Sequence, residues 1–499
     1  MEVQAAGETR EQPASDRAWS IETNGINVVP RSERHGTPSE LFWVWCGANI
    51  SILAVVYGVI IVSFGLSLWQ SILAGVVGTV VSFLLVGFVS LAGKRSGAPT
   101  LALSRAPFGI IGNALPTLIS YLSLVGWETV LVALATLATD SMLDRIGVAT
   151  GTTTKVIAFL IIAAVIILVG LLGHATIVTI QTWFTWAFAV LTVVFIGLEA
   201  SQVDWSALMD LPSGSWLTGF LPATSIVMAG LGISWANTAA DYSRYLPASS
   251  SSRAVVGWTV FGSSIAPVLL ISFGVLLASK GTDLSSSANP LGDLAEPLPT
   301  WFLVPYMLVA AGGLVAGALL DIYSSGLSLL TLGIRLPRYQ SVVIDGVLMI
   351  LGAIYMLFIA EDFLGTFQGF LLVLGVPLAA WAAVFLVDLA MLRRDGYDER
   401  ALYGGVPGGT ARAVNPAGVV SWLIGVVVGL GLITSTTTGF TWLGWWATGA
   451  FEGSSLGLLV AFVVAGALYC LWTLIAAARP GPSAEPRPTT GDSATGSAR

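Results

Sequence analysis

Two carboxylates lie deep inside long apolar stretches of this 499-residue chain. Glu128 lies in the run Leu-Val-Gly-Trp-Glu-Thr, and Asp321 lies in Leu-Leu-Asp-Ile-Tyr-Ser. A charge at the centre of a membrane helix costs about 2.5–3.5 kcal/mol on insertion scales. Because desolvation favours the neutral acid, either group could bind and release a proton; the alternative is a structural role in buried hydrogen bonds. Asp345 and Asp388 lie nearer to the ends of apolar stretches, where the structural role is the simpler interpretation.

Two tryptophans, Trp127 and Trp235, lie in the middle of apolar stretches, beside a carboxylate or a run of small residues. Most of the 18 tryptophans are typical of aromatic belts at membrane interfaces, and these two differ by their central position. Two indole faces could enclose a flat ligand by stacking. The edge of a planar heterocycle presents donors and acceptors that suit a carboxylate and backbone amides. The residue types therefore favour a flat, polar, aromatic substrate.

Two of the apolar stretches, the first and the sixth, are interrupted by small and polar residues. They read Cys-Gly-Ala-Asn-Ile-Ser (46–51) and Gly-Leu-Gly-Ile-Ser-Trp-Ala-Asn-Thr (230–238). Transporters bind substrates near the bilayer midplane at such breaks, where free backbone groups face the ligand. The alternative is that small residues only allow helices to pack closely. The candidate substrate-binding residues of the two breaks are Gly47, Asn49, Ser51, Gly230, Gly232, Ser234, Trp235 and Asn237.

The composition excludes most other classes of protein. Hydrophobic residues make up 55% of the chain and charged residues 10%, against roughly 25% charged residues in soluble proteins. A net charge of −7 without a basic patch argues against nucleic-acid binding. Cys46 and Cys470 lie in apolar runs and imply no disulfide framework, and His35 and His174 are too few for a histidine-rich metal site. We expect no enzyme, no metal and no cofactor other than a coupling ion.

Twelve apolar stretches are long enough to cross a bilayer, and their continuous apolarity disfavours a β-barrel. Five stretches separate the starts of the two broken ones, which is the spacing of a five-plus-five inverted repeat. The sequence therefore predicts an all-α polytopic membrane protein with twelve transmembrane helices, in which two C-terminal helices follow the inverted repeat. The predicted helices are 41–65, 67–92, 109–138, 154–173, 175–198, 217–239, 254–279, 300–328, 340–360, 364–391, 417–437 and 455–478.

The predicted transporter domain covers residues 41–478. Its first repeat spans about 41–198, its second about 217–391, and the appended helices 417–478. The flanking segments 1–40 and 479–499 are polar and are expected to be disordered cytoplasmic tails.

The distribution of Lys and Arg orients the chain, because cytoplasmic loops carry the excess of these residues. With both ends in the cytoplasm, only Arg145, Lys155 and Lys280 of the 21 Lys and Arg lie outside. The sequence predicts a multi-pass protein of the plasma (inner) membrane, surrounded by lipid bilayer, with both termini cytoplasmic. The oligomeric state stays open.

An ordered set of motifs resembles the purine–cytosine permease branch of the nucleobase:cation symporter family. Ser-Arg-Ala-Pro-Phe-Gly (104–109) precedes the third stretch, Asp-Tyr-Ser-Arg-Tyr-Leu-Pro (241–247) follows the sixth, and Asp-Ile-Tyr-Ser-Ser-Gly-Leu-Ser (321–328) lies in the eighth. The resemblance runs from about residue 35 to 478. It implies a five-plus-five fold shared with sodium-coupled amino-acid transporters, and import of nucleobases or related heterocycles driven by Na⁺ or H⁺. It also implies that Trp127 stacks on the substrate.

Two positions around the implied substrate site depart from the family pattern. The aromatic second wall of some members falls on Gly232, so this wall is missing unless Trp235, three residues later, supplies it. The polar amide that reads the substrate edge in relatives falls on Leu131.

The eighth stretch departs in a way that bears on the coupling ion. A substrate-binding Asn of the family is replaced by Asp321, and the hydroxyls of the family's sodium site fall on Val315 and Ala316. A hard cation needs several oxygen ligands, whereas a proton needs only a titratable carboxylate. The sequence therefore favours H⁺ over Na⁺, with Asp321 and Glu128 as the candidate coupling residues. Both are also candidate substrate-binding residues.

Three charged residues, Arg105, Asp241 and Arg244, lie at the cytoplasmic ends of the third and sixth stretches. Either these charges only orient the chain in the membrane and lie at helix ends, or they form a cytoplasmic gate that closes the inner vestibule.

The most concrete functional hypothesis is a cation-coupled importer of a nucleobase such as cytosine or a purine. The alternatives are transport of a related heterocycle (allantoin, a hydantoin, thiamine or its pyrimidine precursor) or an amino-acid transporter of the same fold.

Overall fold

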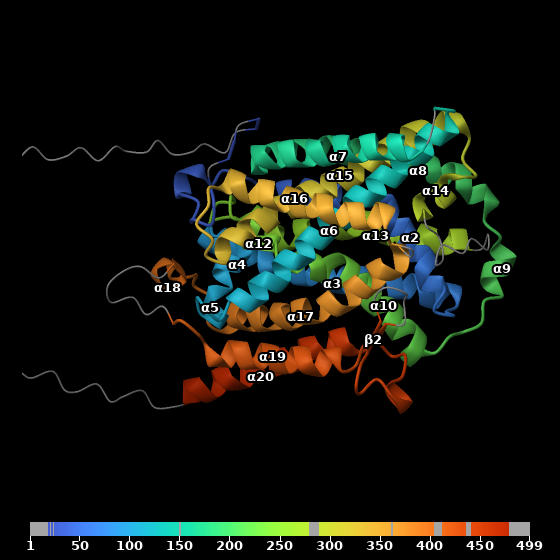
Figure 1. Ribbon diagram of the computed structural model, residues 1–499. Helices are drawn as coiled ribbons and strands as arrows, with labels where there is room; N and C mark the ends of the chain where they lie inside the picture. The colour runs from blue at the N-terminus through green and yellow to red at the C-terminus, as the bar shows by residue number, and fades with distance from the viewer. Residues whose placement is uncertain are drawn as a thin grey trace, which may run out of the picture.

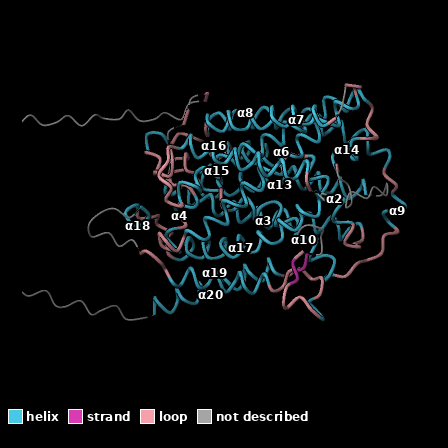
Figure 2. Tube along the Cα trace, in the orientation of Figure 1, coloured by secondary structure: helices cyan, strands magenta, loops and turns pink. Residues whose placement is uncertain are grey.

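The computed structural model describes residues 18–19, 21–22, 24–148, 151–278, 289–360, 363–403, 412–435 and 441–478. Its regular structure is helical apart from one antiparallel pair of short strands, β1 (Thr434–Ser435) and β2 (Trp442–Leu443) (Figure 2). The predicted tail 479–499 and residues 1–17 of the other tail lie outside the described residues.

Ten helices in the described part of the chain are long and apolar enough to cross a membrane, and the bent pair α1 (Glu40–Asn49) and α2 (Ile52–Val62) makes eleven. The shorter α19 (Pro416–Leu430) overlaps the predicted eleventh stretch, 417–437. An all-α polytopic membrane protein is confirmed, and the helices are consistent with twelve spans. The ten are α3 (Leu68–Ser96), α6 (Ala114–Arg145), α7 (Thr152–Leu172), α8 (His174–Glu199), the composite sixth span Trp216–Ala236, α13 (Ser252–Leu277), α15 (Thr300–Thr331), α16 (Arg338–Phe358), α17 (Phe363–Met391) and α20 (Gly457–Ala478).

Short elements connect these spans. They are η1 (Arg31–Glu33), α4 (Thr100–Leu103), α5 (Arg105–Phe108), η2 (Ala200–Gln202), α9 (Trp205–Met209), α12 (Ala239–Ser243), α14 (Pro290–Ala295), α18 (Glu399–Tyr403) and η7 (Gly449–Phe451).

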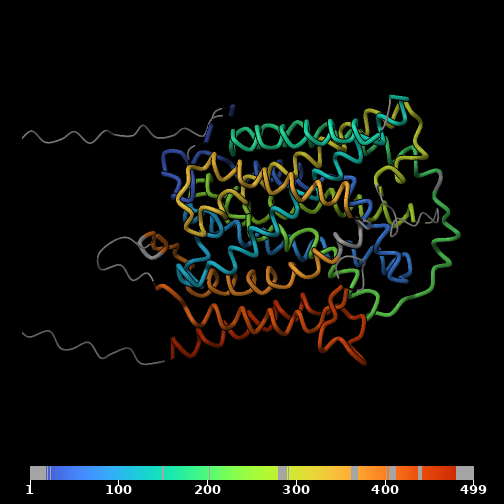
Figure 3. Tube along the Cα trace, viewed as in Figure 1, coloured from blue at the N-terminus to red at the C-terminus, as the bar shows by residue number. Residues whose placement is uncertain are grey.

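The helices form an inner and an outer set. In the apolar 18-residue stretches of α6, α15 and the composite sixth span, 72%, 67% and 83% of the stretch is buried inside the protein. In those of α7, α8 and α20 the buried share is 28%, 28% and 22%. Exposed apolar side chains on the outer set are what a lipid-facing surface requires. Helices α19 and α20 lie together on the flank of α17 (Figures 1 and 3).

Both ends of the described chain lie at one end of the helix bundle, on the left in Figure 1. We call this end, at which α1 begins and α20 ends, the terminal face. The short helix α9 lies at the opposite end (Figure 1).

The first span is broken between α1 and α2, which meet at an angle of 57°. Ile50 has φ −79° and ψ 83°, outside the helical region, and Ser51 is extended at φ −138° and ψ 145°. The Ser51 hydroxyl accepts a hydrogen bond from the Leu53 amide at 3.3 Å and so caps α2. A helix start inside an apolar span needs such a partner, because no water is present to solvate the free amides.

The sixth span is interrupted at the position that the sequence indicates. It runs through η3 (Trp216–Phe220), α10 (Leu221–Met228), η4 (Ala229–Ile233) and α11 (Ser234–Ala236). The two η segments are π-helical turns, and Leu231 has the non-helical angles φ −119° and ψ −107°. The Ser234 hydroxyl donates to the Ala229 carbonyl at 2.5 Å, which satisfies a carbonyl at the break.

The structure differs from the expectation of a disordered N-terminal tail over residues 24–39. Val29 is fully buried and its amide donates to the Gly97 carbonyl at 2.8 Å, and Arg34 donates to the Ser96 carbonyl at 2.5 Å. These contacts fix the segment to the end of α3 at the terminal face. The polar composition of the segment did not reveal that it is ordered, because its partners are backbone carbonyls at the end of a distant helix.

Candidate functional site

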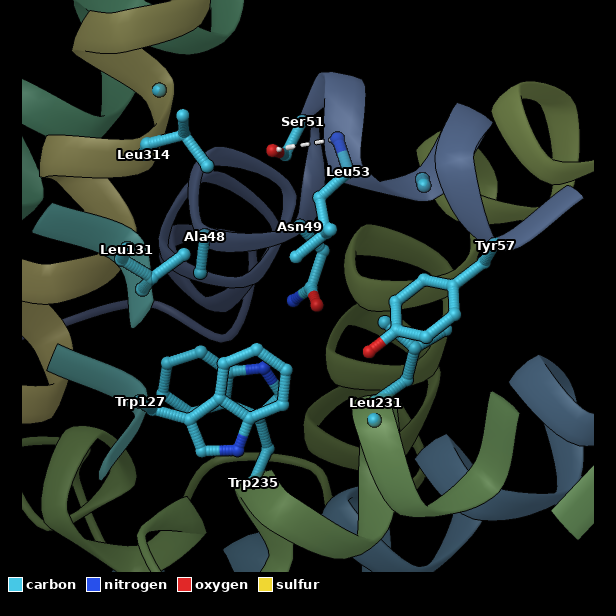
Figure 4. Close-up of a pocket in the computed structure, with 14 residues that line it drawn as sticks. Ala48, Asn49, Ser51, Leu53, Tyr57, Trp127, Leu131, Leu231, Trp235 and Leu314 are labelled. Carbon is cyan, nitrogen blue, oxygen red and sulfur yellow. Dashed lines mark hydrogen bonds between the residues drawn. The ribbon is translucent and has the colours of Figure 1, made fainter. Parts of the chain in front are cut away.

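A central cavity lies where the two broken spans face α6 and α15. Figure 4 shows side chains from the first span, α6, α15 and the sixth span converging on it. Its lining residues are Ala48, Asn49, Ser51, Leu53, Ala54, Tyr57, Trp127, Leu131, Gly230, Leu231, Trp235, Gly313, Leu314 and Gly317.

Five of the candidate substrate residues line this cavity: Asn49, Ser51, Trp127, Gly230 and Trp235. The two breaks therefore open onto the same space as both central tryptophans. The position expected to carry a polar amide, Leu131, also lines the cavity and adds an apolar surface.

The two indoles are nearly buried, with Trp127 7% and Trp235 8% exposed. Trp235 is held by Trp45, whose ring lies edge-on at 5.7 Å between centroids and an interplanar angle of 78°. Trp45 in turn packs edge-on against Tyr242 at 5.5 Å. This chain of aromatic contacts fixes Trp235 at the cavity wall.

Polar groups reach the cavity from the first span. The Asn49 side-chain amide donates to the Trp45 carbonyl at 2.8 Å, and its carboxamide points toward the indoles in Figure 4. Tyr57, which the sequence did not single out, lies against Gly230, where an added Cβ would meet the Tyr57 hydroxyl oxygen at 2.1 Å. Only glycine allows this tyrosine to approach the sixth span so closely, so the Gly230 position is explained by its fit to a neighbour.

The remaining candidates of the two breaks lie outside the cavity lining and contact neighbouring helices. An added Cβ on Gly47 would lie 2.2 Å from Oε1 of Gln181 in α8. The Asn237 side-chain amide donates to the Ser120 hydroxyl of α6 at 2.5 Å. Ser234 bonds its own break, as described above. These positions fit the alternative interpretation, in which small residues at a break only allow the helices to pack closely.

Gly232 faces α3 and not the cavity. Its amide donates to the Ser82 hydroxyl at 3.2 Å, and an added Cβ would lie 2.2 Å from the Ser82 carbonyl carbon. An aromatic side chain at this position would point into the α3 backbone, so Gly232 does not offer a place for a second stacking wall.

We expect Gly232→Ala to destabilise the protein by about 1–3 kcal/mol, because the new methyl group overlaps backbone that has no flexible end to move. Gly257→Ala is the matched control, since an added Cβ there meets nothing within 4 Å. Thermal unfolding of the two purified variants, followed by tryptophan fluorescence, measures the difference. Equal melting temperatures would contradict the close contact with α3.

Glu128 lies beside Trp127 but outside the cavity lining, wholly buried. The Ser325 hydroxyl contacts Oε1 of Glu128 at 2.7 Å and Oδ2 of Asp345 at 3.1 Å, and the Tyr121 hydroxyl donates to Asp345 at 2.6 Å. Through Ser325, the structure thus brings Glu128 close to Asp345, for which the sequence favoured a structural role. Sequence spacing carried no signal of this pairing, because the two residues lie 217 positions apart.

Asp321 lies one helical turn from the cavity-lining Gly317 on α15 and is 2% exposed. Its Oδ2 has no hydrogen-bond partner among the described residues. The neighbouring backbone is held by Tyr242, whose hydroxyl donates to the Leu320 carbonyl at 2.7 Å and lies 3.1 Å from the Ser324 hydroxyl. Asp321 itself is not among the residues that line the cavity, and a buried carboxyl group with an open oxygen is able to accept a proton.

A glutamine fills the space between the first and eighth spans. The Gln181 side-chain amide donates to the Ala316 carbonyl at 2.7 Å, and its other end abuts Gly47. Val315 and Ala316 offer no hydroxyl, and this carbonyl is already bonded. Among the described residues, no group of three or more His, Cys, Asp or Glu side chains could hold a metal ion.

The three candidate gate residues each have other partners at the terminal face. Arg105 donates to the carbonyls of Thr331 and Leu402, at 2.8 and 3.2 Å, and not to Asp241. Asp241 accepts hydrogen bonds from the amide and hydroxyl of Thr100, at 2.7 and 2.9 Å. Asp241 lies beyond the composite span, and burial raises the pKa of its carboxyl to about 6 against the opposing effects of Thr100 and Arg244.

Arg244 is fully buried and binds Glu22 of the N-terminal segment at 3.3 Å. It also donates to the Gly25 carbonyl at 2.7 Å and to the Tyr323 hydroxyl at 2.8 Å. Both Arg244 and Tyr323 belong to motifs singled out in the sequence, but Glu22 carried no signal.

A family model described as a permease for cytosine/purines, uracil, thiamine and allantoin matches residues 28–460. YxlA of Bacillus subtilis, named as a purine–cytosine permease, is 28% identical over 428 residues, which cover 83% of this chain and 87% of YxlA. The purine–cytosine permease FCY2 of Saccharomyces cerevisiae is 25% identical over 54% of this chain and 50% of its own length.

Solved transporters share the fold. Mhp1, a nucleobase-cation-symport-1 family transporter, superposes in its closed conformation with bromovinylhydantoin bound at a TM-score of 0.71, with 17% identity, over 91% of this chain and 95% of Mhp1. Its inward-facing conformation superposes at 0.63, with 17% identity, over 92% and 95%. A Na⁺-coupled sialic acid symporter superposes at 0.58 with 12% identity, over 88% and 91%.

Proposed function

The chain belongs to the family of permeases for cytosine and purines, uracil, thiamine and allantoin, and we propose that it imports a nucleobase such as cytosine or a purine by cation-coupled secondary active transport. The members of this family are transporters and not enzymes. The observation that carries the proposal is the central cavity, in which two broken spans meet two buried indoles. A cavity bounded by two indoles, with polar side chains such as Asn49 and Ser51 in its wall, suits a flat, polar heterocycle.

The substrate lies flat on Trp127, and Trp235 bounds the same space from the sixth span. Asn49, Ser51 and the backbone groups freed at the two breaks form hydrogen bonds with the polar groups at its edge. Aromatic stacking accepts any planar ring, so the choice among bases is made by these edge contacts.

We favour H⁺ as the coupling ion, carried by Asp321 or Glu128. Two observations support this: each of these buried carboxyl groups has one oxygen without a hydrogen-bond partner among the described residues, and Val315 and Ala316 offer no hydroxyl.

Transport proceeds by alternating access. The first, second, sixth and seventh spans form a bundle (α1 with α2, α3, the composite sixth span and α13) that rocks against a scaffold of α6, α7, α15 and α16. The terminal face is cytoplasmic, the protein resides in the plasma membrane, and Arg244 and Asp241 belong to the inner gate.

Uptake of radiolabelled cytosine into proteoliposomes tests the proposal. We expect accumulation when a pH gradient, acidic outside, is imposed alone, and none with a Na⁺ gradient alone. Accumulation with Na⁺ only would keep the nucleobase proposal and contradict the choice of ion.

Competition separates the alternative substrates. We expect unlabelled purines to reduce cytosine uptake, and amino acids to leave it unchanged because they present no ring to stack. If allantoin, a hydantoin or thiamine is taken up and cytosine is not, the substrate is a related heterocycle.

A further inference from the structure

The terminal face contains a built site for a carboxylate, and Glu22 occupies it. Oε1 of Glu22 lies 3.3 Å from both the Arg244 guanidinium and the Tyr323 hydroxyl, and the Tyr245 hydroxyl donates to the same oxygen. Oε2 accepts a hydrogen bond from the His174 amide at 2.8 Å. Glu22 is 8% exposed, so these donors replace its water.

We propose that this site binds the protein's own N-terminal segment, and that Glu22 latches the bundle to the scaffold until the transporter opens toward the terminal face. The latch rests on the proposed alternating-access function. It goes beyond it by naming a segment outside the twelve spans as the part that holds the inner mouth closed.

The donors to Glu22 come from spans on both sides of the proposed movement. Arg244 and Tyr245 directly follow α12 at the end of the sixth span, which belongs to the bundle. Tyr323 lies on α15 of the scaffold, and His174 begins α8. One carboxylate therefore ties together elements that must separate when the bundle rocks.

The scaffold contributes a second cation to the site. Arg338, at the start of α16, places its guanidinium 4.0 Å from Oε2 of Glu22 and 4.8 Å from the centre of the Tyr323 ring. Arg338 is 6% exposed and Arg244 is fully buried. Removing the carboxylate that they share would leave two buried guanidiniums with too little compensating charge, which is costly unless water enters. Loss of the latch therefore favours a hydrated, open mouth.

Gly173 shows that the backbone is shaped to receive this carboxylate. It has φ +82°, which glycine adopts without a steric penalty, and an added Cβ would lie 2.2 Å from Oε2 of Glu22. A side chain at this position would block access to the His174 amide. The site is thus fitted to Glu22 by backbone as well as by side chains.

The rest of the segment, residues 24–39, crosses the terminal face, and we call it the strap. After Glu22, the Gly25 carbonyl accepts from Arg244, and the Ile26 carbonyl accepts from the Tyr403 hydroxyl at 2.5 Å. Val29 then bonds Gly97 at the end of α3, as described above. Figure 1 shows this dark-blue start of the described chain lying at the left end of the helices.

Labelling of the full-length protein from the terminal face tests the latch without any substrate. Leu330 of α15 lies beneath the strap, because an added Cβ on Gly25 would be 3.4 Å from its Cδ1. In a Leu330→Cys background, we expect Glu22→Gln to speed reaction with a membrane-impermeant maleimide at least about tenfold, since one partner of a buried ion pair is removed. Glu33→Gln removes the same charge from the same segment, outside the site, and should not change the rate. Equal rates in the two variants would overturn the proposal.

A cross-link tests the movement with Glu22 intact. Treating the variant Gly25→Cys/Leu330→Cys with a short bifunctional thiol reagent should stop net uptake and leave substrate binding from the opposite face unchanged. The two single-cysteine variants control for reaction at Cys46 and Cys470. Unchanged uptake after complete cross-linking would overturn the latch. If the wild type transports none of the tested heterocycles, the proposed function fails, while the labelling contrast still decides the latch.

Discussion

Trp127→Ala is expected to weaken substrate binding by about 5- to 150-fold and to abolish high-affinity uptake. Stacking of a base on an aromatic side chain contributes about 1–3 kcal/mol, and each 1.4 kcal/mol is tenfold in affinity. Trp127 lines the central cavity and is 7% exposed, so its indole face is available to a ligand in the cavity and not to lipid. Binding of radiolabelled cytosine to the purified variant measures the loss directly.

Two control variants separate stacking from a general loss of structure. Trp127→Phe keeps an aromatic face and should recover part of the affinity. Trp186→Ala removes a tryptophan that is 59% exposed on the outer helix α8, so binding should stay normal. Wild-type affinity in Trp127→Ala would contradict the stacking model, whereas equal losses in Trp127→Ala and Trp186→Ala would indicate misfolding.

Asp321→Asn is expected to uncouple transport from the pH gradient while leaving substrate exchange intact. The amide has nearly the same shape as the acid but does not titrate, and the family pattern carries Asn at this position, so the fold should accept it. Symport of one proton supports about tenfold accumulation per pH unit, and the variant should show no accumulation. Parallel measurements of uptake against a pH gradient and of exchange at equal pH test this.

Two further carboxylates complete this test: Asp388 is the control, and Glu128 is the second candidate proton carrier. Asp388 is 1% exposed but bonded to Tyr469 at 2.9 Å and to Arg393 at 3.3 Å, so Asp388→Asn should affect stability and not coupling. Glu128→Gln examines the second candidate, which contacts Ser325 and lies near Asp345. If accumulation survives in Asp321→Asn and is lost in Glu128→Gln, the proton carrier is Glu128.

The interior of the protein was predictable to different degrees at different positions. The two breaks were visible because small and polar residues stand out in an apolar stretch, and the structure bends the chain at Ile50 and Leu231 within them. Which glycine faces a ligand was not visible. Gly230 lines the cavity, while Gly232, two residues later, faces α3, and this depends on how an irregular turn rotates the chain.

The partners of the charged residues were also beyond the sequence. Arg105 and Asp241 each lie in a recognisable motif, but the first binds backbone carbonyls and the second binds Thr100. Arg244 binds Glu22, a residue in a segment with no motif and no apolar pattern. Ion pairs between residues more than 200 positions apart leave no local trace in a single sequence.

The sequence by itself determined that this is a polytopic helical membrane protein of a known permease family, and it located the two broken spans, the central tryptophans and the buried carboxylates. These follow from composition, from apolar length and from motifs, which are local properties of the chain. Only the tertiary structure decided that Trp127 and Trp235 share one cavity, that Glu128 and Asp345 both contact the Ser325 hydroxyl, and that the N-terminal segment closes over the terminal face. Those facts depend on helix rotation and on which distant helices touch, and packing of the whole chain sets both.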